Sequence, residues 1–174
     1  MGQRGVNVEE KLILVKVDTK YCDYLRKFDN KVPYNFNEKE IRPFVGVLFE
    51  INDCSYFAPL SSPKPKHLKL KSKLDFLKID NGKLGAINFN NMIPVTNKNI
   101  VKIDLEKEGI TKTEKKYIKL LKEQIYWLNR NSEKIFGRSN KLYEKYISNK
   151  LDTNTYKRCC NFLLLEEKCK EYNK

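Results

Sequence analysis

Short apolar runs separated by turn residues dominate the first half of the chain, and runs of this kind predict β-strands. The expected strands are 12–17, 44–51, 54–60, 92–95 and 100–104. Asn52-Asp53 suits a tight hairpin between the second and third of them. A second hairpin is expected within "FLKIDNGKLGAINF" (76–89), where Asn81-Gly82 would supply the positive φ angles of a type I′ turn. The spacing of the runs predicts a small, twisted antiparallel sheet or a partly open barrel.

Apolar positions at helical spacing bracket this sheet. Asp18 can cap a first helix whose Tyr21, Leu25 and Phe28 share one face, and this helix should end before Pro33. Three more helices are expected in the second half of the chain, at 112–131, 139–149 and 153–172.

These patterns predict an α+β fold in which several helices, mostly C-terminal, are added to an antiparallel sheet. In the last helix, Leu163 to Leu165 should be buried. At 174 residues and 40% hydrophobic, the chain is expected to form one domain, 1–174, in which 1–10 is a loose N-terminal tail.

The charge of the chain is strongly basic, with 35 Lys+Arg against 22 Asp+Glu and a formal net charge of +13. An excess of this size concerns partners rather than fold, and it favours nucleic acid, an anionic membrane surface or an acidic protein. A membrane is the least favoured, because no stretch approaches the roughly 18 to 20 apolar residues of a spanning helix. Since the N-terminus lacks an apolar secretory segment, a cytosolic protein is expected.

Cysteine usage agrees with a reducing compartment. The five cysteines are odd in number and contain no C-x-x-C pair, and a single histidine leaves no zinc constellation. All five are therefore interpreted as small buried hydrophobes.

Several enzyme classes are disfavoured by what the chain lacks. None of the glycines forms a phosphate-binding loop, no acidic cluster has metal-site spacing, and no serine stands in a G-x-S-x-G context. Cleavage of RNA without a metal is still possible, because RNA carries its own nucleophile, the 2′-hydroxyl. A protein then has only to position that hydroxyl, move two protons and stabilise charge on phosphorus.

The segment "LSSPKPKH" (60–67) holds groups suited to such chemistry. It contains two adjacent hydroxyls, two lysines and the single histidine, and its prolines would stiffen a loop. The same residues are also ordinary loop chemistry, and by spacing alone a solvated surface loop is the favoured interpretation.

Five stretches in order resemble the ToxN/AbiQ family of type III toxin–antitoxin endoribonucleases. They cover about residues 13–172 and are "KYCDYLRKFDNKVP" (20–33), "RPFVGVLFEINDCSYFAPLSSPKPKH" (42–67), "KLGAINFNNMIPV" (83–95), "NRNSEKI" (129–135) and "CNFLLLEEK" (160–168).

The resemblance implies a MazF/Kid-like core, a twisted sheet or SH3-like barrel. It implies metal-independent cleavage of cellular or phage RNA that leaves 2′,3′-cyclic phosphate and 5′-hydroxyl ends, with no cofactor. The implied partner is a small RNA pseudoknot, cut by the toxin from a repeat precursor, which inhibits the toxin and closes with it into a ring-like assembly. The implied setting is the bacterial cytoplasm, in phage defence by abortive infection or in locus maintenance, without a membrane or DNA partner.

The resemblance also places site residues. Ser62 matches the serine central to activity, Ser61 its hydroxyl neighbour, and Lys64 the lysine two residues later. Arg42 stands where the family has a lysine, so a cation is kept although arginine cannot act as an acid or base at neutral pH. Tyr21 matches a tyrosine near the active groove.

Each of these roles has a plainer alternative. Ser61 can cap a turn, Lys64 can touch a neighbouring phosphate only, and Tyr21 can pack in the core. His67 has a pKa suited to proton transfer, but a base-stacking or phosphate contact fits it equally well.

A basic RNA groove is expected from exposed lysines, together with His67. These lysines are Lys66, Lys69, Lys71 and Lys73 after the serine pair, and Lys115, Lys116, Lys119 and Lys122 on the 112–131 helix. Tyr117, Tyr126 and Trp127 are candidates for base stacking, with the core as the default for Trp127. The helical lysines can also form no more than a solvated face.

Two other functions remain open at this point. One is a non-catalytic RNA- or DNA-binding module, which would retain RNA intact. The other is a ribonuclease toxin neutralised by an acidic protein antitoxin, whose complex would survive nuclease treatment.

Overall fold

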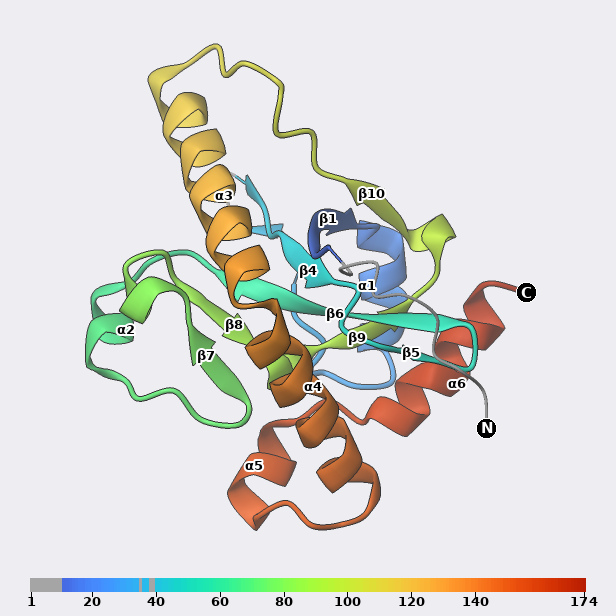
Figure 1. The fold of residues 1–174 in the computed structure, drawn as a ribbon. Helices are drawn as coiled ribbons and strands as arrows, with labels where there is room; N and C mark the ends of the chain where they lie inside the picture. Colours follow the sequence, from blue (N-terminus) through green and yellow to red (C-terminus); the bar gives the residue numbers. More distant parts are fainter. Residues whose placement is uncertain (1–10, 35, 38–39) are drawn as a thin grey trace, which may run out of the picture.

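The computed structural model describes residues 11–34, 36–37 and 40–174 (Figure 1), so the expected tail, 1–10, lies outside them. The strands are β1 Ile13–Val17, β2 Phe36–Asn37, β3 Glu40–Ile41, β4 Phe44–Gly46, β5 Glu50–Ile51, β6 Cys54–Ser61, β7 Phe76–Lys78, β8 Ala86–Asn88, β9 Ile93–Val95 and β10 Ile100–Lys102. The helices are α1 Thr19–Arg26, α2 Pro65–Lys69, α3 Lys112–Arg130, α4 Ser132–Ile147, α5 Thr153–Arg158 and α6 Phe162–Tyr172, with 3₁₀ turns η1 Asp80–Gly82, η2 Phe89–Asn91 and η3 Asn97–Asn99.

The main sheet is antiparallel, with the strand order β10-β1-β4-β6-β8-β7. β5 and β9 also pair with β6, which makes β6 the strand with the most neighbours. β10 and β7 end the order without pairing with each other, so the described strands form an open sheet rather than a closed barrel. The mixed helix-and-sheet fold is thus as predicted.

Helices cover both faces of the central strand. In Figure 1, α3 and α4 cross one side of the sheet in near continuity, while α6 packs against β9 and α1. Six of the eight residues of β6, from Tyr56 to Leu60 together with Cys54, are therefore buried. This double burial explains why the strand reads as an unbroken apolar run instead of an alternating one. Ser61 is the position at which β6 leaves the core.

The first helix begins as predicted at Asp18, whose side chain accepts from the Lys20 N–H at 2.9 Å. Tyr21 and Leu25 are buried on its inner face, but Phe28 lies beyond the last turn and is exposed. The hairpin at Asn52-Asp53 is confirmed, because both residues have positive φ and Ile51 pairs with Cys54.

Three predicted elements differ from the structure. The expected strand 44–51 is two short strands, β4 and β5. The second hairpin pairs as expected, but residues 79–85 connect its strands through η1 rather than a two-residue turn. The expected helix 153–172 is broken into α5 and α6.

Smaller differences concern helix ends and burial. α4 starts earlier than the predicted 139–149, at Ser132. Leu165 is buried as predicted, whereas Leu163 is 53% exposed. All five cysteines are free and buried, which confirms their interpretation as core residues.

Candidate active site

The serine pair lies where the central strand leaves the core. Ser61 ends β6 opposite Ala86 of β8, and its Oγ accepts from Asn88 Nδ2 at 2.7 Å. Asn88 stands diagonally across the two strands, on the face that Ser61 shares. The Ser61 hydroxyl is therefore held by the neighbouring strand, while Ser62, the next residue, is exposed.

Arg42 lies just before β4, the other strand that flanks β6 in the sheet order, and close to Ser61. Phe44 pairs with Pro59, and the Leu60 N–H donates to the Pro43 carbonyl at 2.9 Å, so the continued register places Arg42 next to Ser61. Burial lowers the pKa of the guanidinium, and its Nε is buried without a hydrogen-bond partner in the part of the chain that the structure describes. Arg42 is thus a cation at the serine pair with unused hydrogen-bonding capacity.

Prolines restrict the backbone that follows Ser61. Ser62 precedes Pro63 and Lys64 precedes Pro65, and a residue before proline is biased to an extended conformation. Lys64 is extended, with φ −136° and ψ 147°, and stands at the N-cap of α2. Both Ser62 and Lys64 are exposed, so their side chains leave a stiffened segment into solvent.

The 79–85 connection supports this segment from behind. Gly85 has φ +97°, and a Cβ there would stand 1.9 Å from the Ser61 carbonyl oxygen. Gly82 has φ +93°, and a Cβ there would stand 2.6 Å from the His67 carbonyl oxygen. The Leu84 carbonyl between them accepts from Gln124 Nε2 of α3 at 2.8 Å. The glycines thus allow a close approach that any side chain would prevent.

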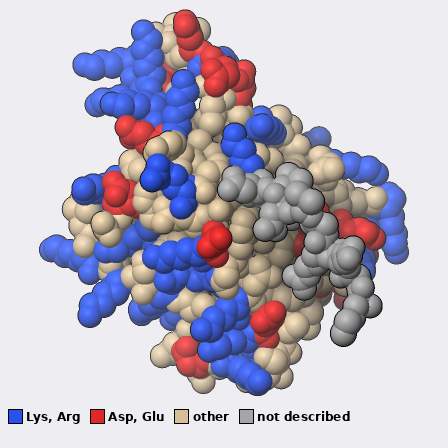
Figure 2. Space-filling model, viewed as in Figure 1, with Lys and Arg blue, Asp and Glu red and all other residues tan. Residues whose placement is uncertain are grey.

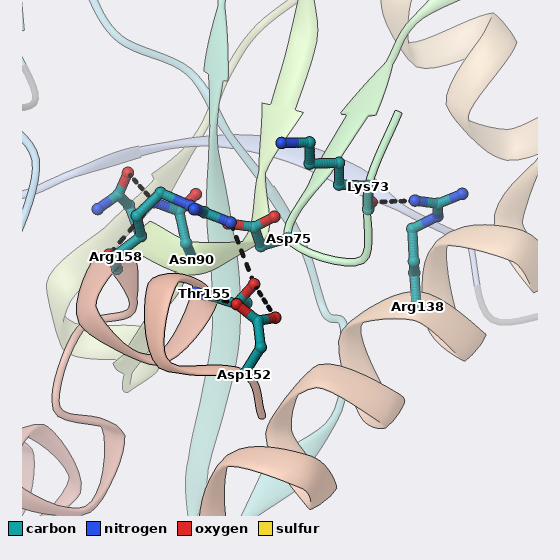
Figure 3. A network of polar contacts seen from close by, with 8 residues as sticks. Lys73, Asp75, Asn90, Arg138, Asp152, Thr155 and Arg158 are labelled. Atoms are coloured by element: carbon teal, nitrogen blue, oxygen red, sulfur yellow. Dashed lines mark hydrogen bonds and ion pairs between the residues drawn. The ribbon is translucent and has the colours of Figure 1, made fainter. Parts of the chain in front are cut away.

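The far end of the stretch that follows Ser62, near residues 73–75, is tied to the C-terminal helices (Figure 3). Arg158 of α5 donates through Nε to Asp75 Oδ2 at 2.8 Å, and Arg138 of α4 donates to the Lys73 carbonyl. The Arg158 carbonyl accepts from Asn90 Nδ2 at 3.3 Å. The segment is therefore fixed at both ends, by β6 at Ser61 and by two arginines near residues 73–75.

The predicted lysines divide into two exposed groups. Lys66, Lys69, Lys71 and Lys73 belong to the segment after the serine pair, which we call the basic segment (64–73). Lys115, Lys116, Lys119 and Lys122 lie on the N-terminal two thirds of α3. Figure 2 shows Lys and Arg gathered over the upper part of α3 and along the edge near α2.

Two predicted site residues lie in the interior. Tyr21 is fully buried, and its hydroxyl donates to the Pro94 carbonyl at 2.6 Å. Burial, reinforced by the neighbouring Cys169, raises the pKa of that hydroxyl, so Tyr21 stays a protonated core donor. His67 is 2% exposed, and this position does not support the predicted stacking or phosphate contact with RNA. The structure therefore places Arg42 beside Ser61, with Ser62 and Lys64 exposed directly after it, whereas Tyr21 lies in the core.

The three aromatic candidates on α3 also differ in burial. Tyr117 and Trp127 pack partly buried against the core, as the default for Trp127 predicted. Tyr126 is 65% exposed, and its hydroxyl accepts from Arg130 at 3.0 Å.

Asn88, Gly85 and the Arg158–Asp75 pair were not identified as site residues from the sequence. The stretch "NGKLG" did carry a turn signal, but the strand register that sets it against Ser61 is a tertiary feature. In the part of the chain that the structure describes, no helix is both long and apolar enough to cross a bilayer. Likewise, no three of its His, Cys, Asp or Glu side chains gather into a metal-binding group.

Comparisons with known proteins show which family the chain belongs to. Residues 13–170 match the family described as "Toxin ToxN, type III toxin-antitoxin system". Endoribonuclease ToxN of Bacillus thuringiensis subsp. kurstaki is 35% identical over 160 residues, which are 90% of this chain and 81% of the relative.

Two solved structures are similar over nearly their whole length. One, from work on selective toxin inhibition by a non-coding RNA pseudoknot, has a TM-score of 0.79 and 32% identity and covers 95% of this chain and 99% of its own. AbiQ, a lactococcal anti-phage endoribonuclease of the type III systems, has a TM-score of 0.76 and 31% identity, with 94% and 98% covered. The chain belongs to the ToxN family of type III toxin–antitoxin toxins.

Proposed function

We propose that this chain is the endoribonuclease toxin of a type III toxin–antitoxin system and that Ser62 lies in its active site. The observation that carries the proposal is the position of Ser62, exposed at the end of the central strand beside Ser61, Lys64 and Arg42, whose Nε has no hydrogen-bond partner among the described residues. Relatives that share this chain's fold over nearly its full length are endoribonucleases.

The reaction is a transesterification within RNA. The 2′-oxygen attacks the adjacent phosphorus as its proton leaves, the bond from phosphorus to the 5′-oxygen breaks, and that oxygen takes up a proton. The products are a 2′,3′-cyclic phosphate and a 5′-hydroxyl. The reaction needs no metal if protein groups stabilise the phosphorane that forms on the way.

Each residue of the site has a distinct role in this reaction. The Ser62 hydroxyl hydrogen-bonds a phosphate oxygen, and Ser61, oriented by Asn88, aligns the same group. Lys64 and Arg42 stabilise the negative charge that develops on phosphorus. Tyr21 has no part in this mechanism, because its hydroxyl is committed to Pro94.

The partner of the toxin is a small, repeat-derived RNA pseudoknot. This follows the solved relative inhibited by a non-coding RNA pseudoknot. The basic segment and the lysines of α3 offer phosphate contacts both to that RNA and to a cellular or phage substrate. The toxin cuts its antitoxin from a precursor and assembles with it into a ring-like complex, in the bacterial cytoplasm where both RNAs occur.

The finer fold assignment belongs to the same proposal. The open sheet around β6 is the counterpart of the MazF/Kid core, with the helices of the C-terminal half added to it. The proposed role of the toxin in phage defence follows the anti-phage activity of AbiQ.

The decisive experiment is cleavage in EDTA. Protein stripped of bound RNA is incubated with a long transcript, and the new ends are mapped for wild type, Ser62→Ala and the control Ser148→Ala, an exposed serine at the end of α4. Discrete cuts ending in cyclic phosphate, lost only in Ser62→Ala, are expected. Intact but bound RNA would instead indicate a non-catalytic RNA-binding module.

The identity of the antitoxin is tested separately. The native complex is treated with a nuclease and its size is measured. An RNA-held complex dissociates into free toxin, whereas a complex with an acidic protein antitoxin stays whole and would overturn the assignment of the RNA partner.

A further inference from the structure

His67 is buried one turn away from Lys64 and bonded to it twice. The ring Nδ1 of His67 accepts from the Lys64 N–H at 3.3 Å, and the backbone N–H of His67 donates to the Lys64 carbonyl at 2.9 Å. The first bond is the half of a capping box that the N3 side chain makes, with histidine in the place where glutamate or glutamine is usual, and the second is the backbone bond of the turn. The two bonds fix the turn that carries Lys64.

The bond to the Lys64 amide sets the protonation state of the ring. Nδ1 can accept only when it carries no proton, so the imidazole is neutral with its hydrogen on Nε2. An imidazolium has hydrogen on both nitrogens and cannot accept this bond. The turn therefore depends on a neutral His67.

The surroundings of the ring favour the same state. Phe76 of β7 lies with its ring centroid 6.0 Å away, and Gly82 of η1 packs on the His67 backbone. Burial first, then the charges of Lys66 and Lys64, lowers the pKa of His67 below its usual 6.5. The packed elements also carry the charged residues Lys78 and Asp80, with Lys83 directly after η1, and the causes of the shift are burial, Lys66 and Lys64.

We propose that His67 is a positioning residue of the candidate site: its neutral imidazole holds the Lys64 backbone and thereby aims Ser62 and Lys64 at the RNA phosphate. It neither touches RNA nor transfers a proton. Pro63 and Pro65 stiffen the segment on either side of Lys64, and the imidazole supplies a hydrogen bond to the Lys64 amide. The inference rests on the proposed function, because the segment that it orders is the one assigned to the phosphate.

A first test measures the protonation state of the imidazole by NMR. His67 is the single histidine of the sequence, so untagged full-length protein gives one set of ring resonances. The ¹⁵N shifts are expected to show protonated Nε2 and bare Nδ1, with a titration midpoint below 6.5. A ring protonated at Nδ1 near neutral pH, or a midpoint above 6.5, would overturn the inference while leaving the nuclease assignment untouched.

A second test separates positioning from proton transfer. Glutamine at N3 of a capping box accepts from the N-cap amide but cannot act as an acid or base near pH 7. His67→Leu keeps an apolar side chain and removes the acceptor. We expect roughly 10- to 100-fold loss of kcat in His67→Leu with KM little changed, because a small misplacement of catalytic groups costs this much. His67→Gln should recover most of the loss, and its rate should lack the decline at acidic pH that protonation of the ring is expected to cause in wild type.

The variants are compared only where circular dichroism shows both to be folded. Equal loss of kcat in His67→Gln and His67→Leu would assign the ring to proton transfer and overturn the positioning role. Wild-type rates in both variants would overturn it as well. Wild-type protein that fails to cut RNA in EDTA would instead contradict the proposed function, and the ring resonances would still test the hydrogen bond to Lys64.

Discussion

Gly85 stands against the backbone of Ser61 so closely that a single added carbon would lie 1.9 Å from the Ser61 carbonyl oxygen. Its φ of +97° is also a conformation that side-chain-bearing residues rarely adopt. Gly85→Ala is therefore expected to move the serine pair and to lower the free energy of unfolding by about 2–4 kcal/mol. Urea unfolding and the rate of RNA cleavage measure the two effects.

Gly137 in α4 is the matched control. A Cβ there would meet nothing within 4 Å, so Gly137→Ala should leave cleavage unchanged and stabilise the helix by up to about 1 kcal/mol. If Gly85→Ala and Gly137→Ala had the same unfolding free energy and the same cleavage rate, the supporting role of Gly85 would be contradicted.

The Arg158–Asp75 ion pair should hold the far end of the basic segment. The Asp75 side chain is 4% exposed, so Arg158→Ala leaves a buried carboxylate without this cation. Because Arg158 itself is 43% exposed, a loss of only about 1–2 kcal/mol in unfolding free energy is expected. The rate of RNA cleavage by Arg158→Ala should also fall, mainly through a higher KM, because the loop bearing Lys73 and its neighbours is less firmly held.

Lys157→Ala controls for the lost charge, since Lys157 is the exposed neighbour of Arg158 on α5. It should change neither stability nor cleavage by more than the experimental error. If the two variants lose the same stability, the ion pair does not anchor the segment.

The elements that sequence patterns predicted well are those whose signals are local. Asp18 caps α1, Asn52-Asp53 turns a hairpin and α3 follows its apolar stripe, and each depends on residues close together in the chain. The double burial of β6 likewise shows in its unbroken apolar run.

The break between α5 and α6 has one local signal, Asn161, which caps α6 by accepting from the Leu164 N–H at 3.2 Å, but asparagine alone does not predict a break. No glycine or proline marks it, and long-range partners satisfy its backbone groups instead. Lys31 Nζ donates to the Cys159 carbonyl at 2.8 Å, the Cys160 N–H donates to the Asn90 carbonyl at 2.8 Å, and Asp29 Oδ2 accepts from the Asn161 N–H at 2.6 Å. Tertiary hydrogen bonds of this kind override a helical pattern that the sequence favours.

The same difference between local and long-range signals applies to the candidate site. Ser62 and Lys64 were identified from a contiguous motif, but the placement of Arg42 and Asn88 beside Ser61 depends on strand register. His67 was predicted to contact RNA because its residue type suits that role. Its burial follows from the packing of Phe76 and Gly82, which are distant in sequence.

Glu166 should be a major contributor to stability. It is buried, and its Oε1 accepts from the hydroxyls of Tyr56 and Tyr143 at 2.6 and 2.7 Å, which joins β6, α4 and α6. Burial, with the adjacent carboxylate, raises the pKa of both tyrosines, so both remain donors. Glu166→Leu leaves the Tyr143 hydroxyl without this acceptor and the Tyr56 hydroxyl with only the Phe162 carbonyl at 3.4 Å, and it should cost about 3 kcal/mol in urea unfolding.

Glu166→Gln keeps an acceptor oxygen and should cost about 1 kcal/mol. The exposed Glu167 provides the control, because Glu167→Gln alters only a surface contact with Lys168 and should be nearly neutral. A Glu166→Leu protein as stable as wild type would show that the two hydroxyls find other partners.

The lysines of α3 should set the salt dependence of RNA binding. If about six lysines neutralise phosphates, the log–log slope of affinity against salt is about −4 for single-stranded RNA. Lys119→Gln with Lys122→Gln should make it shallower by about 1.4. Lys98→Gln with Lys170→Gln removes the same charge from η3 and α6 and should leave the slope nearly unchanged. Equal slopes for the two double variants, measured in a Ser62→Ala background to keep RNA intact, would indicate that α3 carries only a solvated face.

The folding stability of the protein should depend on pH through His67. The pKa of this ring is lowered in the folded protein, mainly by burial, from a value of about 6.5 in the unfolded chain. Between the two values the unfolded chain binds more protons, so stability rises with pH. The contribution of His67 is fully present above about pH 6.5 and is lost as pH falls toward the folded-state pKa.

Urea unfolding of wild type and His67→Gln between about pH 4.5 and 8 isolates the contribution of His67 to the free energy of unfolding, because the carboxylates titrate alike in both proteins. The stability of wild type relative to the variant should fall on acidification, and a constant or rising difference would show that the imidazole is not held neutral in the fold.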